Sequence, residues 1–123
     1  MNGISVFADT NPLVYLLDGK SEVAEFLDGK QVWISFITEL ELFGKRGLSE
    51  QEISAINELV DNCFVSDINS HIKSLTKQLL QQYKLKIPDA IIAATALYLD
   101  LPLLTADSGF RKIHELKLIL LEI

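Results

Sequence analysis

The sequence has a single cysteine, Cys63, among its 123 residues. One cysteine cannot form a disulfide within the chain, and Cys63 lacks the histidine and cysteine neighbours of a zinc site. We expect it to be a small buried side chain in a strand. No apolar run approaches the roughly 18 residues that cross a bilayer, and the N-terminus has no basic segment before an apolar signal core. These absences predict a soluble cytoplasmic protein without a membrane segment.

The chain also lacks internal repeats, low-complexity tracts and linkers. With 49% hydrophobic residues, it can build one substantial core but is too short for two. We therefore expect one domain over residues 1–123.

Short apolar runs alternate with helical patterns along the chain, which is typical of a parallel sheet with helices on both faces. The pattern predicts strands at 4–8, 32–35, 63–66, 103–105 and 117–121. It predicts helices at 12–17, 21–28, 37–44, 50–61, 70–83, 88–99 and 108–114. The expected fold is a three-layer α/β/α domain around a mostly parallel sheet of about five strands.

Several helix ends have a recognisable chemical signal. Ser49 and Glu52 have the spacing of a capping box, in which each side chain accepts from the other's backbone N–H. Asn11 can cap a helix that begins at Pro12. Gly29 and Gly44 stand where a left-handed residue would end a helix. We expect these residues to set the boundaries of the helices around them.

Three aspartates stand where an apolar run meets a helix or a turn. Each has a structural explanation: Asp9 as a turn residue, Asp89 as an acid at a helix N-terminus, and Asp107 as the start of the next helix. However, open parallel sheets bind ligands at the carboxyl ends of their strands, and Asp9 and Asp107 each follow a predicted strand. The helix with Asp89 is apolar on every side, so it should lie against the sheet and point its N-terminus at the same edge.

Carboxylates gathered at one edge imply a metal. They raise one another's pKa, so that a group of three or four stays ionised only when a cation compensates it. Hard oxygen ligands favour Mg²⁺ or Mn²⁺ over zinc. A fourth acid could come from Glu39 or Glu41, which point about 200° apart on a helix, so only one can reach the site. Helical geometry gives Glu41 only a slight preference.

The net charge of -6 argues against a general nucleic-acid binder, because affinity for nucleic acid comes mostly from Lys and Arg that neutralise phosphates. A metal bound by the four acids would offset much of the excess. The basic residues that could then contact a substrate locally are Lys45, Arg46, Arg111 and Lys112.

Four segments carry these acids, in this order: Asp9-Thr10-Asn11, Thr38-Glu39-Leu40-Glu41-Leu42, Pro88-Asp89-Ala90-Ile91-Ile92-Ala93-Ala94-Thr95-Ala96 and Leu104-Thr105-Ala106-Asp107-Ser108-Gly109-Phe110. Together they resemble the motifs of the PIN-domain ribonucleases and, within them, of the VapC-type toxins of bacterial toxin–antitoxin pairs. The resemblance spans nearly the whole chain, and its Thr-x-x-Glu-Leu segment selects Glu41 over Glu39. One departure is Gly109, where many relatives carry an acid.

The resemblance implies a divalent-metal-dependent endoribonuclease. Asp9, Glu41, Asp89 and Asp107 would hold one or two Mg²⁺ or Mn²⁺ ions, with Asn11 and Thr105 as supporting polar groups. A metal-activated water would hydrolyse RNA and leave 5′-phosphate and 3′-hydroxyl ends. The resemblance further implies a homodimer and a protein antitoxin that blocks the site. Because of Gly109, the side of the site formed by the fourth motif would bind a second metal weakly.

Other functions fit less well. A phosphoacceptor receiver domain also gathers acids at strand ends, but it needs a lysine after its last strand, where this chain has only Glu122. A haloacid-type phosphatase needs a second aspartate two residues after the first, and position 11 is asparagine. A non-catalytic relative that binds RNA or protein through the same surface is disfavoured by the presence of all four acids.

Overall fold

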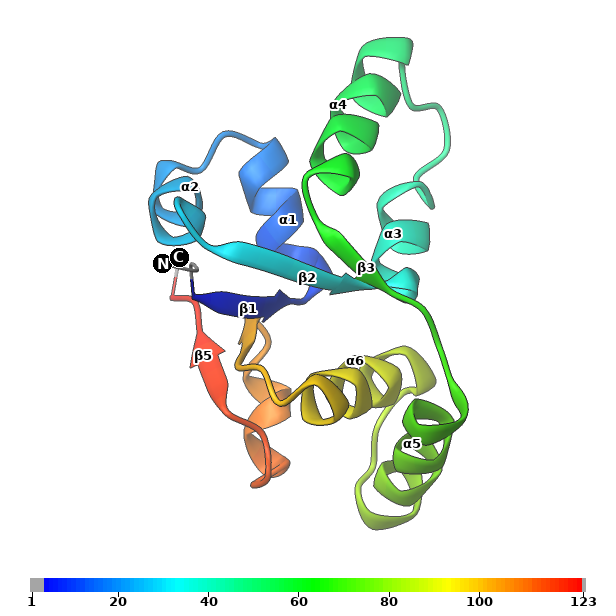
Figure 1. Cartoon of the computed structure of the whole chain (residues 1–123). Coiled ribbons are helices and arrows are strands. Elements are labelled where there is room, and N and C mark those ends of the chain that lie inside the picture. Colours follow the sequence, from blue (N-terminus) through cyan, green and yellow to red (C-terminus); the bar gives the residue numbers. More distant parts are fainter. Residues whose placement is uncertain (1–3, 123) are drawn as a thin grey trace.

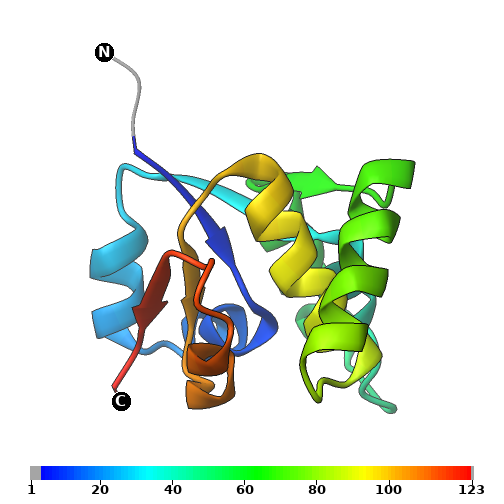
Figure 2. The same ribbon diagram turned by 90° about the horizontal axis from the view of Figure 1, so that it is seen from below.

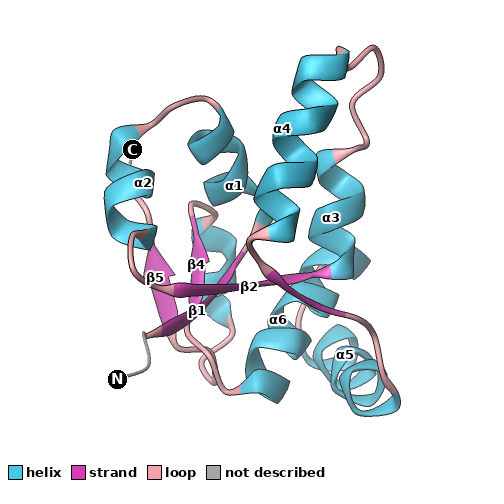
Figure 3. Ribbon diagram, turned by 45° about the horizontal axis from the view of Figure 1, so that its top comes forward, coloured by secondary structure: helices cyan, strands magenta, loops and turns pink. Residues whose placement is uncertain are grey.

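The computed structural model of the chain describes residues 4–122 and contains a sheet of five parallel strands. The strands are β1 (Ser5–Ala8), β2 (Gln31–Ser35), β3 (Phe64–Ser66), β4 (Leu103–Thr105) and β5 (Leu118–Leu120). Their order is β3-β2-β1-β4-β5, which puts β1 in the centre (Figure 3). All four neighbouring pairs are parallel, as expected. The carboxyl ends of β1, β2 and β4 therefore meet at one edge.

Helices cover both faces of the sheet (Figure 1). They are α1 (Thr10–Leu17), α2 (Ser21–Leu27), α3 (Phe36–Leu42), α4 (Glu50–Asp61), α5 (Ser70–Gln82), α6 (Ile87–Leu99) and the 3₁₀ helix η1 (Ser108–Lys112). Helices α1 to α4 lie on one face, whereas α5 and α6 lie side by side on the other (Figure 2). The predicted three-layer α/β/α fold is confirmed.

The core follows the alternation of side chains along the central strand. Phe7 is fully buried against α5, α6 and η1, while Val6 and Ala8 point to the clusters on the opposite face. Helix α6 buries every residue from Ala90 to Ala96, which explains why its sequence is apolar on every side. Because α6 is held so firmly, Asp89 in its first turn has a fixed place beside the sheet.

Two of the predicted helix boundaries are confirmed. The Ser49 side chain accepts from the Glu52 backbone N–H, and Glu52 accepts in return from the Ser49 N–H, both at 3.0 Å. Gly29 has a φ of 76°, which is the left-handed conformation that glycine adopts most easily.

The start of α1 and the end of α3 were predicted wrongly. Helix α1 begins at Thr10 and its cap is Asp9, not Asn11, because Asn11 bonds elsewhere. Helix α3 ends at Leu42, and Gly44 does not have a positive φ. A Cβ at position 44 would instead lie 3.2 Å from the carbonyl oxygen of Glu41. Glycine therefore relieves a tight approach to the backbone there and does not form a left-handed turn.

The last helix and the cysteine also differ from expectation. The segment predicted as a helix over 108–114 is a short 3₁₀ helix that drops Phe110 into the core. Cys63 is half-buried and immediately precedes β3. Burial raises the pKa of its thiol to about 11, so it stays protonated and unreactive near neutral pH. No helix within residues 4–122 has the length and apolar character that crossing a bilayer requires.

Candidate metal centre

Asp9 lies at the centre of the candidate site, directly after β1. Its side chain is only 7% exposed. One carboxylate oxygen, Oδ1, accepts from the backbone N–H of Thr10 at 2.8 Å, and the other, Oδ2, accepts from the hydroxyl of Thr105 at 2.8 Å. Thr105 ends β4, the strand beside β1. Two neighbouring strand ends therefore fix this carboxylate.

Thr105 and Asn11 connect Asp9 to Asp107. The Thr105 hydroxyl also accepts from the backbone N–H of Asp107 at 3.0 Å. Asn11 accepts from the backbone N–H of Ala106 at 2.9 Å, and its amide lies 3.5 Å from Oδ2 of Asp9. Both polar residues singled out in the sequence thus bridge β1 to the loop after β4.

Asp107 caps η1 and is exposed. Its Oδ1 accepts from the backbone N–H of Gly109 at 2.8 Å. A Cβ at position 109 would meet that same oxygen at 3.0 Å, so a larger residue there would displace the carboxylate. In this chain Gly109 both orients Asp107 and leaves room for it.

Glu41, rather than Glu39, contacts the site. The Thr10 hydroxyl donates to Glu41 Oε1 at 2.6 Å and lies 3.1 Å from the buried hydroxyl of Thr38. Residues 38 and 41 are three apart and share one face of α3. Thr10 and Thr38 were not recognised from the sequence as contributing residues, although the Thr-x-x-Glu spacing contains the signal.

The carboxylates influence one another electrostatically. Burial raises the pKa of Asp9, and the charges of Asp89 and Glu41 raise it further, against hydrogen bonds from Thr105 and Thr10. Burial is also the main cause of the raised pKa of Asp89, followed by the charges of Asp107 and Glu41. The four acids from distant segments are therefore close enough to share one electrostatic environment.

The candidate ligands are all carboxylate oxygens, which suit a hard divalent cation. One of these carboxylates, that of Asp9, is nearly fully buried. As the side chains stand, however, no three His, Cys, Asp or Glu residues between positions 4 and 122 are arranged around a single ion. The Glu41 carboxylate accepts from the Thr10 hydroxyl instead. To bind one ion together, three or four of these acids would have to come closer to one another.

Basic residues lie on one side of the acids. Lys112, at the end of η1, lines a pocket of about 210 Å³ together with Asp89 and Asp107. Lys84 and Lys86 line the same pocket and were missed in the sequence, although they directly precede the Pro88-Asp89 motif. Of the other three expected substrate contacts, Lys45 lies elsewhere, in the groove described next, and Arg46 and Arg111 are exposed and line neither cavity.

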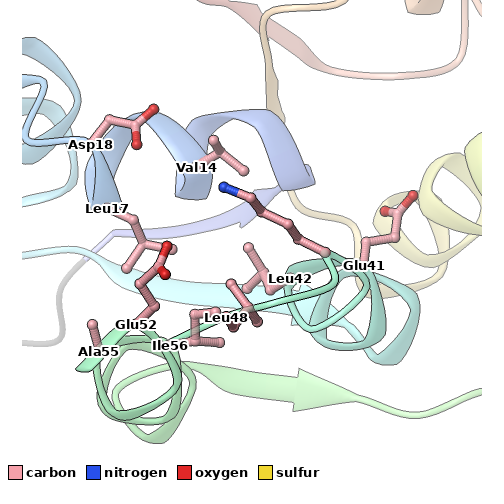
Figure 4. Close-up of a pocket in the computed structure, with 10 residues that line it drawn as sticks. Val14, Leu17, Asp18, Glu41, Leu42, Leu48, Glu52, Ala55 and Ile56 are labelled. Carbon is pink, nitrogen blue, oxygen red and sulfur yellow. The ribbon is translucent and has the colours of Figure 1, made fainter. Parts of the chain in front are cut away.

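A second cavity, of about 270 Å³, lies between α1, α3 and α4 (Figure 4). Its apolar lining comes from Val14, Leu17, Leu42, Leu48, Ala55 and Ile56. Asp18, Glu41 and Glu52 give its rim three acids, against the single base Lys45. Because Glu41 belongs to both, this apolar groove is continuous with the acid cluster.

Comparisons with known proteins show the family and the fold of the chain. The PIN domain family matches residues 6–116. A chain of a toxin–antitoxin complex from Klebsiella pneumoniae is 31% identical, with a TM-score of 0.83 over 96% of this chain and 99% of that one. A chain of VapBC-1 from nontypeable Haemophilus influenzae is 27% identical, with a TM-score of 0.77 over 95% and 98%.

A chain of VapBC2 from Rickettsia felis, in a complex bound to a fragment of promoter DNA, has a TM-score of 0.79 over 97% of this chain and 100% of that one. At 19% identity it shows a shared fold only. A search of curated protein sequences found no match. The family match runs from β1 to Leu116, just before β5, and so includes every segment that carries a candidate acid. The chain belongs to the PIN domain family.

Proposed function

We propose that the protein is a cytoplasmic, divalent-metal-dependent endoribonuclease and the toxin of a toxin–antitoxin pair, formed by one domain over residues 1–123. PIN domains are in general nucleases, and membership in that family removes the receiver-domain alternative. The observation that carries the proposal is Asp9, a carboxylate buried at the sheet edge with Glu41 and Asp89 near enough to raise its pKa. Such a group favours a bound cation.

Asp9, Asp89 and Asp107 would be the principal ligands of one or two Mg²⁺ or Mn²⁺ ions, and Glu41 a ligand or the base that orients water. When bound, the metal lowers the pKa of water and neutralises charge on the phosphate during in-line attack. Thr105 and Asn11 hold Asp9 and the loop with Asp107 in a fixed relation, as supporting groups in metal sites commonly do. No side-chain nucleophile is needed, and the products would carry 5′-phosphate and 3′-hydroxyl ends.

The test is cleavage of an end-labelled RNA by the purified protein with Mn²⁺. We expect cleavage by the wild type, loss of activity in EDTA with recovery when Mn²⁺ is restored, and no activity in Asp9→Asn. Glu39→Gln removes a neighbouring acid from the same helix as Glu41 and should cleave normally. Activity that persists in EDTA, or in Asp9→Asn, would show that the acids are not the catalytic centre.

The partner we propose is a protein antitoxin that occupies the apolar groove between α1, α3 and α4. Similar chains come from toxin–antitoxin complexes. The groove fits a segment with an apolar face and a basic side chain, since its rim is mostly acidic and ends at Glu41. A basic group placed there would compete with the metal for the carboxylates.

Co-expression with the product of a short neighbouring reading frame tests this partner. Val14→Glu places a charge in the groove and should abolish co-purification, while Ile53→Glu, on α4 but outside the lining, should not. Equal co-purification of both variants would place the antitoxin on another surface.

We also propose a homodimer. Leu40 and Ile87 are 61% and 63% exposed, and each lies within two residues of an acid of the site. Exposed apolar side chains mark contacts between proteins where they form one patch, and the helices that carry these residues, α3 and α6, contact each other. Light scattering should show a dimer for the wild type and a monomer for the double variant Leu40→Glu, Ile87→Glu, and a dimer that survives both changes would put the interface elsewhere.

A further inference from the structure

Three lysines line the pocket beside Asp89 and Asp107. Lys84 and Lys86 come from the segment between α5 and α6, and Lys112 comes from the end of η1. The cavity of about 210 Å³ opens directly onto the two aspartates. A protein with a net charge of -6 therefore gathers three positive charges at one side of its acid cluster.

These lysines are held from both sides of the pocket. Leu85 packs against the main core, and because the chain at Lys86 is extended, the lysines on either side of Leu85 project away from that core. Phe110 is almost fully buried and anchors η1. The Lys112 ammonium donates to the carbonyl oxygen of Lys84 at 2.9 Å, which ties the two walls together.

The pocket lysines do not form salt bridges with the neighbouring acids Asp89 and Asp107. Within residues 4–122 the one salt bridge joins Lys117 to Asp100, at 3.0 Å. None of the three pocket lysines comes within 4.0 Å of a carboxylate oxygen in that part of the chain. Lys112 donates one of its three ammonium N–H groups to the carbonyl oxygen of Lys84, so two remain to bind an anion.

The two sides of the acid cluster differ in charge. The groove beside Glu41 is apolar, and its rim carries three acids and one lysine, whereas the pocket beside Asp89 carries three lysines and the two aspartates Asp89 and Asp107. A polyanion that places one phosphate at the acids is repelled by the first side and attracted by the second.

We propose that Lys84, Lys86 and Lys112 bind the backbone phosphate of RNA next to the one that is hydrolysed, so that the strand leaves the acid cluster between α6 and η1. This inference rests on the proposed ribonuclease function and adds to it the path of the substrate. It also explains how a protein with a net negative charge would bind a polyanion such as RNA. Local lysines supply the attraction that net charge does not.

Binding of a fluorescent single-stranded RNA, measured by anisotropy over a range of salt concentrations, tests the proposal. Every protein carries Asp9→Asn so that the RNA stays intact. The variants are Lys84→Gln with Lys86→Gln, and Lys112→Gln, while Lys73→Gln with Lys77→Gln on the exposed side of α5 is the control with equal charge change. Lys112→Arg keeps the charge and should retain binding.

Each pocket lysine that is removed should lower the slope of log affinity against log salt by about 0.7, the value for single strands. At physiological salt this corresponds to roughly a tenfold weaker binding for the double variant. In the active protein the same changes should raise KM and leave kcat nearly unchanged. The control pair should match its parent in slope and affinity.

The outcomes separate this proposal from the proposed function. If the wild type cleaves RNA with Mn²⁺ but the pocket variants match the control pair, the ribonuclease stands and the lysine path is wrong. If the wild type neither cleaves nor binds RNA, both are wrong. If kcat falls and KM does not change, the lysines act on the carboxylates rather than on the substrate.

Discussion

Asp9 caps α1, yet capping alone does not explain an aspartate at this position. The cap of α3 is Ser35, which is fully buried and performs the same task with a neutral hydroxyl. A carboxylate in a buried place costs stability unless a partner compensates its charge. Asp9 keeps hydrogen bonds from Thr10 and Thr105, but the nearby charges of Asp89 and Glu41 work against it. Its charge is consistent with a role in binding a cation.

Thr105 is the residue through which we expect Asp9 and Asp107 to be positioned. Thr105→Val keeps the shape but removes the donor to Asp9 and the acceptor for the Asp107 N–H. We predict a 10- to 100-fold weaker affinity for Mn²⁺, roughly the effect of losing a supporting group at a metal site. The free energy of unfolding should fall by about 1–3 kcal/mol because buried polar groups lose partners. Calorimetry and urea unfolding measure the two effects.

Thr95→Val is the matched control. Thr95 is also buried, and its hydroxyl donates to the carbonyl oxygen of Ile91 within α6, away from the acids. It should lose stability without a change in Mn²⁺ affinity. If both variants bind Mn²⁺ as tightly as the wild type, Thr105 has a structural role only.

At the scale of elements, the start of helix α4 is the boundary that the local sequence determines most clearly. This helix also forms one wall of the apolar groove. Ser49→Ala breaks the capping box and should lower the free energy of unfolding by about 1 kcal/mol. Ser54→Ala, in the exposed interior of the same helix, should be neutral or slightly stabilising because alanine favours helix. Equal destabilisation by both would mean that the cap contributes nothing specific.

Strands β1 and β4 were predictable because a buried parallel strand is a short, largely apolar run, as Leu103-Leu104-Thr105 illustrates. The start of α1 was not, since both Asp9 and Asn11 are good caps. The choice depends on Asn11 accepting from Ala106, 95 residues away. Likewise η1 is short because Phe110 must enter the core, a demand that no local pattern records.

The acids at the sheet edge were predictable for a similar reason. Parallel topology alone brings Asp9 next to the loop with Asp107. Helical geometry could not separate Glu39 from Glu41, because the choice depends on Thr10 from another element. Lys84 and Lys86 were missed because the direction of side chains on an irregular segment depends on how Leu85 packs.

At the scale of the whole molecule, the clustered acids should make stability depend on pH when no divalent metal is present. The pKa values of Asp9 and Asp89 are raised above 3.8 in the folded state, so above this pH the folded protein holds more protons than the unfolded chain. The contribution of these two groups to the free energy of unfolding therefore falls as pH rises through the raised values, and the destabilisation by them is complete above those values.

The comparison that isolates this effect is the wild type against Asp9→Asn in EDTA, by thermal unfolding from about pH 4 to about pH 7. We expect the stability of the variant relative to the wild type to increase as pH rises, and the variant to be the more stable protein at neutral pH. Added Mn²⁺ should reverse that order, because a ligand that binds only the folded state stabilises it. If the difference in stability between the two proteins does not change with pH, the charge of Asp9 does not destabilise the fold.

The most direct measurement of the whole account is calorimetric titration of the metal-free protein with Mn²⁺. The wild type should bind one or two ions, and Asp9→Asn, Asp89→Asn, Asp107→Asn and Glu41→Gln should each bind at least about tenfold more weakly. Glu39→Gln should bind as the wild type does. Undiminished binding in Asp9→Asn and Asp89→Asn, or no binding in the wild type, would contradict a shared metal site at this sheet edge.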